Sequence, residues 1–220
     1  MTRSPVSSGL ASLHVLADDD PRWKWDPVEQ ARAACAGGAG VIQLRVKHAG
    51  DRGALDWARE IRRATRDAGA LFFVNDRFDL ALIAGADGVH LGQTDLPPSR
   101  LPVPEREGLR IGRSTHDLAQ VRTARAEPVD YIAFGPVFGT RSKRSEYADR
   151  GLPLLERAVG AASPLPLVAI GGIDASNAES VLRSGAAGLA VISAVAAADD
   201  PVDATRDLVA CVERVHGPSR

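Results

Sequence analysis

The sequence has few cysteines, no excess of charge of either sign and no long apolar run. Cys35 and Cys211 are the only cysteines among 220 residues, and they lie far apart without the short spacing of a metal site, so we expect free thiols. The 27 basic and 28 acidic residues nearly cancel, which excludes bulk attraction to nucleic acid or membranes. No apolar stretch approaches the length of a membrane span, and residues 1–10 carry no secretory core. We therefore expect a cytoplasmic protein that binds neither nucleic acid nor a membrane.

The composition is that of an ordinary globular protein. Hydrophobic residues make up 45% of the chain and charged residues 25%, as in typical soluble domains. A length of 220 residues suits one domain with a well-buried core. We expect this domain to span residues 10–216, with flexible ends at 1–9 and 217–220.

Short apolar runs alternate along the chain with segments of helical pattern. The predicted strands are 13–17, 41–45, 71–74, 88–91, 109–112, 131–134, 167–170 and 189–192. The predicted helices are 27–36, 51–68, 79–84, 117–126, 153–162, 177–184 and 203–216. Four prolines in 95–108 exclude a long helix there and predict a short helical turn in an irregular loop. Eight strand–helix units predict an α/β fold, a single-domain (β/α)8 TIM barrel, and leave an open doubly wound sheet as the alternative.

Polar residues follow the predicted strands, which is where parallel α/β enzymes place their active sites. Gln43, Arg45 and Lys47 alternate at the end of the second strand, so their side chains point to the same side. Cations that point into a barrel are costly unless an anion meets them at its mouth. The spacing therefore predicts an anion site. A solvated loop is the alternative for Arg45 and Lys47, whereas Gln43 lies too far inside the strand to belong to a loop.

Two carboxylates follow neighbouring strands. Asn75 and Asp76 end the third strand, and Asp95 comes shortly after the fourth. Adjacent strand ends bring Asp76 and Asp95 close together, and two carboxylates beside phosphate-binding residues suit Mg²⁺. The alternative for Asp76 is that it helps to cap the helix at 79–84. Capping does not explain Asp95, which a leucine and two prolines follow.

Three further segments are typical of phosphate sites. Ser114 follows the fifth strand, although it could instead cap the next helix. The loop 139–145 is dense in hydroxyls and cations, and it could close over phosphates or form a solvated surface loop. Gly171 and Gly172 follow the seventh strand and Ser193 the eighth, where barrels bind phosphate through backbone N–H groups.

Seven short motifs are spread along the chain. They are Gln43-Leu-Arg-Val-Lys47, Val74-Asn-Asp-Arg77, Gly88-Val-His-Leu-Gly-Gln-Thr-Asp95, Ile111-Gly-Arg-Ser-Thr-His116, Phe134-Gly-Pro-Val-Phe-Gly-Thr-Arg-Ser-Lys143, Ala169-Ile-Gly-Gly-Ile173 and Val191-Ile-Ser193. In this order they resemble the thiamine-phosphate synthase family, over nearly the whole chain. The resemblance implies a (β/α)8 barrel and a transferase that joins 4-amino-2-methyl-5-(diphosphooxymethyl)pyrimidine to 4-methyl-5-(2-phosphooxyethyl)thiazole, giving thiamine phosphate and diphosphate.

The resemblance also implies a role for each matching residue. The pyrimidine diphosphate would be held by Gln43, Leu44, Arg45, Val46, Lys47, Asn75, Ser114 and Lys143. The thiazole phosphate would be held by Thr140, Arg141, Ser142, Gly172, Ile192 and Ser193. Mg²⁺ would be bound by Asp76 and Asp95. Catalysis would rest on Arg45, Lys47 and Lys143, which would neutralise charge on the leaving diphosphate.

The chain departs from the family pattern at several positions. Val46 stands where an acidic residue is frequent, Arg113 stands where a small apolar residue is usual, and Arg144 is an added cation. Arg113 and the loop that follows also resemble the thiazole tautomerases, which share the fold but lack parts of the diphosphate and metal site. The alternatives are therefore a tautomerase that uses His116 as acid or base, and a non-catalytic regulator that binds phosphate ligands. The presence of Gln93 and Asp95 favours the synthase.

Overall fold

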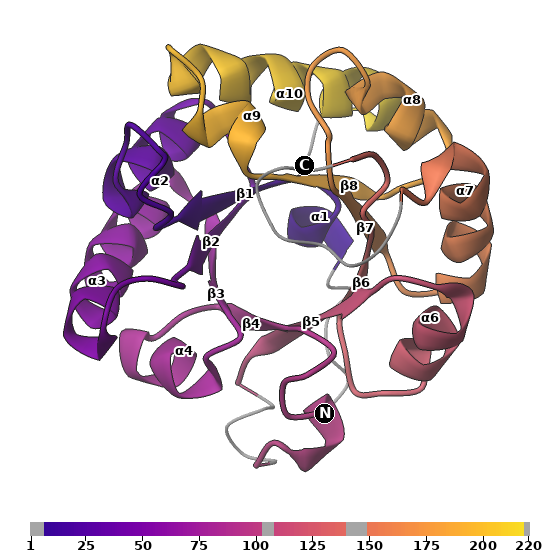
Figure 1. The fold of residues 1–220 in the computed structure, drawn as a ribbon, viewed down its shortest axis with the longest axis horizontal. Coiled ribbons are helices and arrows are strands. Elements are labelled where there is room, and N and C mark those ends of the chain that lie inside the picture. Colours follow the sequence, from indigo (N-terminus) through magenta and orange to yellow (C-terminus); the bar gives the residue numbers. More distant parts are fainter. Residues whose placement is uncertain (1–6, 103–107, 140–148, 218–220) are drawn as a thin grey trace.

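The computed structural model describes residues 7–102, 108–139 and 149–217. Eight parallel strands form a closed barrel in chain order, in which β1 also pairs with β8 (Figure 1). The strands are β1 (Leu13–Asp18), β2 (Val41–Arg45), β3 (Leu71–Asn75), β4 (Gly88–Leu91), β5 (Arg110–Thr115), β6 (Tyr131–Phe134), β7 (Leu167–Ile170) and β8 (Gly188–Val191). The closure confirms the predicted (β/α)8 barrel and excludes an open doubly wound sheet.

A ring of helices surrounds the barrel (Figure 1). Its members are α2 (Pro27–Ala36), α3 (Asp51–Ala68), α4 (Phe78–Ala84), α6 (Leu118–Arg125), α7 (Gly151–Ala162), α8 (Ala178–Arg183) and α10 (Pro201–His216). Local signals set several ends. Asp26 forms a capping box with Glu29 at the start of α2, and Asp117 and Asp200 accept first-turn N–H groups of α6 and α10. No helix among the described residues is long and apolar enough to cross a membrane.

The remaining predicted elements agree with the structure to within a few residues. The proline-rich connection after β4 contains the short 3₁₀ helix η1 (Pro98–Arg100), which matches the predicted helical turn. Helix α7 begins at Gly151, two residues earlier than predicted, so that Pro153 is its third residue. A proline is tolerated there because first-turn N–H groups have no acceptor within the helix.

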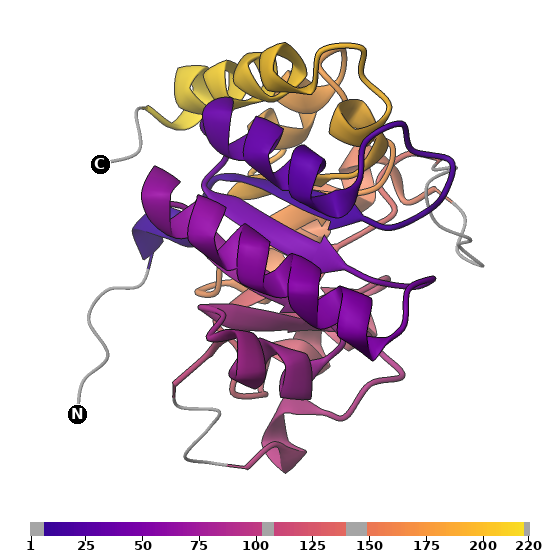
Figure 2. The ribbon, with the colours of Figure 1, turned by 90° about the vertical axis from the view of Figure 1, so that its left-hand side faces the viewer.

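The sequence pattern does not predict two short helices. The helix α1 (Ser7–Leu10) falls in the segment 1–9 that was expected to be flexible, and Leu10 is buried in the same cluster as Val41 and Phe73 of the barrel interior. Figure 1 shows α1 in the centre of the ring, and Figure 2 shows it at the end of the barrel opposite the β1–α2 loop. The helix α9 (Ser193–Ala196) follows β8 directly, so Ile192 precedes a helix instead of ending the strand.

A buried aromatic group fills the middle of the barrel. Side chains alternate along each strand, and the ring of Tyr131 lies where a Cβ on Gly112 would approach to 2.2 Å, which requires glycine at that position. His14 and Phe73 contact the Tyr131 ring edge-on, at centroid distances of 5.3 and 5.9 Å. Burial lowers the pKa of His14 to about 4, although the Leu10 carbonyl lies 2.9 Å from its Nε2 atom. His14 is therefore a neutral core residue at pH 7.

Candidate active site

The carboxyl ends of the strands meet at the end of the barrel opposite α1, and predicted site residues gather there. Arg45 and Asn75 are the last residues of β2 and β3, and Asp76 follows directly. Asp95 lies in the turn after β4, and Ser114 is the penultimate residue of β5. Strand β2 pairs with β3, β3 with β4 and β4 with β5, all in parallel, so these residues lie side by side.

Asp18 pairs with Arg45 at the end of the first two strands. The Asp18 side chain is fully buried and accepts hydrogen bonds from the Arg45 guanidinium, from Trp23 Nε1 at 2.7 Å and from the Asp20 N–H at 3.0 Å. Charge-assisted hydrogen bonds of this kind fix the orientation of a guanidinium. Arg45 is thus held at the mouth of the barrel before any ligand arrives.

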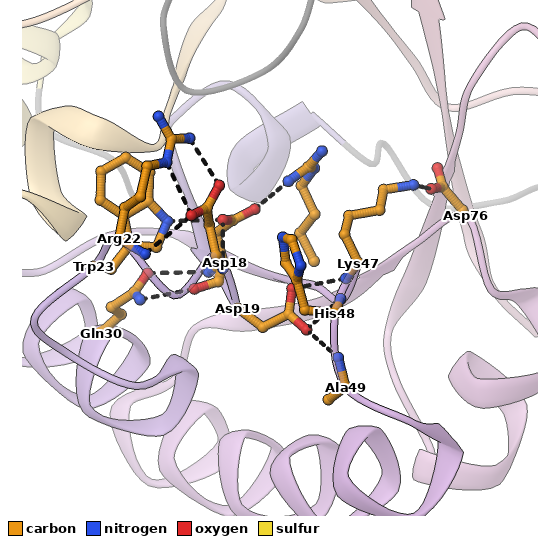
Figure 3. A network of polar contacts seen from close by, with 11 residues as sticks. Asp18, Asp19, Arg22, Trp23, Gln30, Lys47, His48, Ala49 and Asp76 are labelled. Atoms are coloured by element: carbon orange, nitrogen blue, oxygen red, sulfur yellow. Dashed lines mark hydrogen bonds and ion pairs between the residues drawn. The ribbon is translucent and has the colours of Figure 1, made fainter.

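Asp19 fixes the loop that carries Lys47. Its carboxylate accepts the backbone N–H groups of Lys47, His48 and Ala49 at 2.7, 2.8 and 2.8 Å (Figure 3). Three N–H groups around one carboxylate resemble an anion-binding nest. Because Asp19 accepts these backbone N–H groups, they are not open to an added anion, whereas the Lys47 ammonium group is partly exposed.

Lys47, Asp76 and Asp95 form a charged cluster. Lys47 Nζ lies 2.5 Å from Asp76 Oδ2 (Figure 3), and Asp95 Oδ2 accepts the Gly92 N–H at 2.6 Å. Asp76 has a φ of 64°, a conformation that a non-glycine residue rarely adopts without a functional or structural reason. At this turn the Asp76 N–H donates to the His90 carbonyl of β4 at 2.7 Å.

The two carboxylates have opposite pKa shifts. Burial alone would raise the pKa of Asp76, but the hydrogen bond and charge of Lys47 outweigh it and the pKa is lowered. Burial raises the pKa of Asp95, and the negative charge of Asp76 adds to this effect against the opposing Gly92 N–H. The cluster therefore has more negative charge than Lys47 alone compensates, which favours an added cation.

The residues present fit Mg²⁺. A Cβ on Gly92 would lie 3.2 Å from Asp95 Oδ2 and 3.9 Å from Asp76 Oδ1, so both carboxylates border the same small space beside this glycine. Within the described residues, no set of three or more His, Cys, Asp or Glu side chains is placed to bind one metal ion together, so the site would have only these two protein ligands. The described chain would supply two carboxylates, leaving the other positions to water and phosphate oxygens, as Mg²⁺ prefers.

A polar group lies beneath the charged cluster, inside the barrel. The Gln43 side chain is buried, and its Oε1 atom has no hydrogen-bond partner in the described part of the chain. Ser114 Oγ lies 2.8 Å from His90 Nε2, and His90 Nδ1 lies 2.8 Å from the Tyr131 hydroxyl. Burial raises the pKa of Tyr131, so its hydroxyl is protonated at neutral pH. A buried acceptor without a partner is costly, so Gln43 Oε1 is available to a ligand that donates a hydrogen bond.

The loop after β7 is closely packed against the loop after β6. Gly172 has a φ of 64°, and a Cβ there would lie 2.6 Å from the Gly139 carbonyl oxygen and 2.8 Å from Phe138 Cβ. The Gly171 carbonyl accepts the Phe138 N–H at 3.0 Å. Ser193 opens α9 next to this loop, after β8. The two segments follow neighbouring strands, and that is where (β/α)8 barrels frequently bind phosphate.

Several predicted site residues are placed differently or fall outside the described chain. Leu44 is buried in the core between barrel and helices and Val46 packs against it, so only their backbone groups could contact a substrate in the barrel. Ile192 does belong to the cluster inside the barrel. The predicted residues Thr140, Arg141, Ser142 and Lys143 lie outside the described residues.

Sequence reasoning missed Asp18, Asp19 and Trp23, whereas His90 is the buried, hydrogen-bonded core residue that the sequence suggested. The run of three aspartates after the first strand follows the same strand-end rule that identified Asp76 and Asp95, so this signal was available. Trp23 had none, because its contact with Asp18 depends on how the loop after the first strand folds back in space.

Comparison with known proteins assigns the family. A family model described as thiamine monophosphate synthase matches residues 13–195. A thiamine-phosphate synthase of Methanoculleus marisnigri is 48% identical over 198 residues, covering 89% of this chain and 92% of the relative. One from Anaeromyxobacter dehalogenans is also 48% identical, covering 97% of this chain and 95% of the relative. The solved thiamine phosphate pyrophosphorylase of Pyrococcus furiosus is 40% identical with a TM-score of 0.86, covering 96% of this chain and 100% of that one. Sequence and fold agree over nearly the whole chain, which belongs to the thiamine monophosphate synthase family.

Proposed function

We propose that the chain is a transferase that joins 4-amino-2-methyl-5-(diphosphooxymethyl)pyrimidine to 4-methyl-5-(2-phosphooxyethyl)thiazole. The bond between the pyrimidine methylene carbon and the diphosphate oxygen breaks, the thiazole nitrogen bonds to that carbon, and diphosphate leaves. The observation that carries this proposal is the cluster of Lys47, Asp76 and Asp95, which suits a metal–diphosphate complex. Membership of the family supports the reaction.

The charged residues at the mouth would bind and orient the diphosphate. Asp18 occupies one edge of the Arg45 guanidinium, and the remaining N–H groups can donate to phosphate oxygens. Lys47 Nζ, which is partly exposed beside Asp76, could donate to a phosphate oxygen. Mg²⁺, held by Asp76 and Asp95, would supply further charge neutralisation on the diphosphate. We assign Lys143 a similar role from the sequence alone.

The two organic rings would occupy different sides of the barrel mouth. Gln43, Asn75 and Ser114 lie on β2, β3 and β5 and would hold the pyrimidine. Backbone groups at Gly172 and Ser193, after β7 and β8, would receive the thiazole phosphate. The reaction needs no protein nucleophile or strong base, so catalysis consists of positioning and electrostatic stabilisation.

The alternative activities explain the cluster less well. A tautomerase would use His116 as acid or base, but His116 Nδ1 lies 2.6 Å from the Gly135 carbonyl and its backbone N–H donates to Gln120. These contacts indicate a residue that holds neighbouring loops. Neither a tautomerase nor a phosphate-binding regulator needs the strained Asp76 next to a second carboxylate.

The test is release of diphosphate from both substrates, measured with and without Mg²⁺. We expect release that requires both substrates and the metal. Diphosphate release without the thiazole phosphate would indicate hydrolysis. No release under any condition would indicate that the protein is a binding protein or an isomerase. Incubation of the thiazole phosphate alone, followed by NMR, distinguishes these two.

Gln43→Leu should weaken binding of the pyrimidine diphosphate without destabilising the fold. The buried Gln43 Oε1 atom has no partner in the described chain, so its loss frees no protein donor. It would remove an acceptor for the pyrimidine amino group, at a cost of about 1–3 kcal/mol, or roughly fivefold to 150-fold in affinity. Calorimetry of pyrimidine diphosphate binding with Mg²⁺, beside a thermal unfolding curve, measures both effects.

Gln30→Leu is the matched control. Gln30 is equally buried, but its side chain accepts the Asp18 N–H and donates to the Asp18 and Trp25 carbonyls. The same substitution there should lower the melting temperature clearly. If Gln43→Leu binds the pyrimidine diphosphate as tightly as the original chain, Gln43 does not contact the pyrimidine.

Gly172→Ala should weaken binding of the thiazole phosphate selectively. The added Cβ would lie 2.6 Å from the Gly139 carbonyl and must displace the loop packed against it, at a φ of 64° that an alanine adopts with strain. We expect thiazole phosphate affinity to fall at least about tenfold, since backbone must approach phosphate closely there. Pyrimidine diphosphate affinity should change less than about twofold, because it depends on other strands.

Calorimetric titration of each ligand tests this partition. Gly69→Ala is the matched control, because Gly69 has a φ of 71° but no atom within 4 Å of an added Cβ. It should cost stability through strain alone and leave both affinities intact. Equal loss of both affinities in Gly172→Ala would contradict the two-site arrangement.

A further inference from the structure

Arg113 is a buried cation on the outer side of the barrel. Its neighbours in β5, Gly112 and Ser114, face the interior, where they meet Tyr131 and His90. Arg113 therefore points outward, toward the helices, with only 6% of its surface exposed. A buried guanidinium is costly unless its N–H groups find acceptors and its charge finds a partner.

Hydrogen bonds connect Arg113, in the outer core, with the candidate metal site. Its Nη1 atom donates to the Gly92 carbonyl at 2.5 Å, and its Nε atom lies 3.4 Å from Glu127 Oε2, just after α6. The Gly92 N–H donates to Asp95 Oδ2 at 2.6 Å, and the Gly92 carbonyl also accepts the Asp95 N–H at 3.3 Å. Gly92 thus connects the two side chains: its carbonyl accepts from Arg113, and its N–H donates to the Asp95 carboxylate.

Glu127 is placed to orient this guanidinium. The Glu127 side chain is mostly buried, and its Oε2 atom makes no hydrogen bond in the described part of the chain. The Arg113 charge at 3.4 Å is what compensates it there. Removing either member would leave the other charge buried without its partner.

We propose that Arg113 is a positioning residue, which holds the Gly92–Asp95 turn and so aims the Asp95 carboxylate at the space it shares with Asp76. Glu127 in turn holds Arg113. This inference rests on the proposed Mg²⁺ site. Removing a group that orients a metal ligand, without touching the metal itself, commonly lowers metal affinity by 10- to 100-fold.

The test measures metal binding directly, by calorimetric titration of Mg²⁺ in the presence of inorganic diphosphate. Arg113→Met keeps an unbranched side chain but removes the donors, and it should raise the Mg²⁺ dissociation constant about tenfold. Arg113→Lys keeps a charge that can reach the Gly92 carbonyl, and it should recover most of the affinity. In turnover assays, Arg113→Met should raise the Mg²⁺ concentration for half-maximal rate more than it lowers the rate at saturating Mg²⁺.

Arg62→Met is the matched control for loss of a partly buried ion pair. Arg62 Nη1 lies 2.7 Å from Asp87 Oδ2 before β4, at the opposite end of the barrel from the site. This variant should lose stability and keep the Mg²⁺ affinity. If Arg113→Met shows the same pattern, the residue is merely structural and the proposal is wrong.

Two further variants distinguish an error in the proposed metal site from an error in the proposed role of Arg113. Asp95→Asn should lower Mg²⁺ affinity more than Arg113→Met does, and if Asp95→Asn leaves that affinity unchanged, the proposed metal site itself is wrong. If Arg113→Met does not fold, Glu127→Gln carries the test, because it keeps the guanidinium and removes the charge that orients it. An unchanged Mg²⁺ affinity in Glu127→Gln would then overturn the proposal.

Discussion

Asp95→Asn is expected to lose most of the Mg²⁺-dependent diphosphate release while the fold survives. The new amide would provide one neutral oxygen where the proposed Mg²⁺ ion would be bound by a carboxylate. Loss of one preorganised electrostatic contact to a developing charge costs on the order of 10²–10³ in rate. The rate at limiting Mg²⁺ should fall more than the rate at saturating Mg²⁺, because the change acts through metal binding.

The substitution should leave stability unchanged or slightly increased. An amide oxygen can still accept the Gly92 N–H, so the turn after β4 keeps its hydrogen bond. In the folded chain, burial and the charge of Asp76 raise the pKa of Asp95 above its value in the unfolded chain. The charged form therefore opposes folding at neutral pH, and this effect disappears as the pH falls through the two pKa values. A neutral amide removes it.

Rate and stability are measured together for Asp95→Asn and for a control, Asp56→Asn. Asp56 is an exposed carboxylate on α3, with 65% of its side chain accessible, and its substitution should alter neither property. A wild-type rate for Asp95→Asn at limiting Mg²⁺ would show that Asp95 is not a metal ligand.

The barrel could be predicted from the sequence because each strand and helix has a local signal. Continuous apolar runs such as 71–74 predict strands buried on both faces, and Asp117 predicts the start of its helix. The helix α1 escaped prediction because four residues contain no helical period. Its position depends on burying Leu10 against the barrel, which is a tertiary effect.

The site was predictable to the extent that it depends on strand ends and period-two spacing. That rule placed Gln43 inside the barrel and Asp76 beside Asp95. It could not show that Asp18 neutralises Arg45, because their contact depends on the register between β1 and β2. Nor could it show that the Asp19 carboxylate accepts hydrogen bonds from the N–H groups of the loop that carries Lys47.

Arg45→Met should reduce both stability and turnover, for different reasons. Arg45 is the ionic partner of Asp18, whose side chain is fully buried. Removing one member of a buried pair leaves an uncompensated charge and typically costs about 3–5 kcal/mol. Trp23 Nε1 and the Asp20 N–H would still donate to Asp18, so the lower part of this range is expected. Turnover should fall because the variant lacks the guanidinium that we propose binds the diphosphate.

The double variant Asp18→Asn, Arg45→Met separates the two effects. The amide that replaces the Asp18 carboxylate carries no charge, and its oxygen can still accept the hydrogen bond from Trp23, so most of the lost stability should return. The diphosphate contact is still missing, so turnover should stay low. Urea unfolding and diphosphate release, measured on the same preparations, follow the two properties.

Arg32→Met is the control for loss of an ion pair at the surface. Arg32 and Glu60 are exposed by 62% and 42% at their side chains, and breaking such a pair costs about 0–1 kcal/mol. If Arg45→Met costs no more than this control, Asp18 is not held by Arg45 as the structure indicates. If turnover returns in the double variant together with stability, Arg45 acts only by supporting the fold, and the diphosphate must be bound by Lys47, the metal and the loop that carries Lys143.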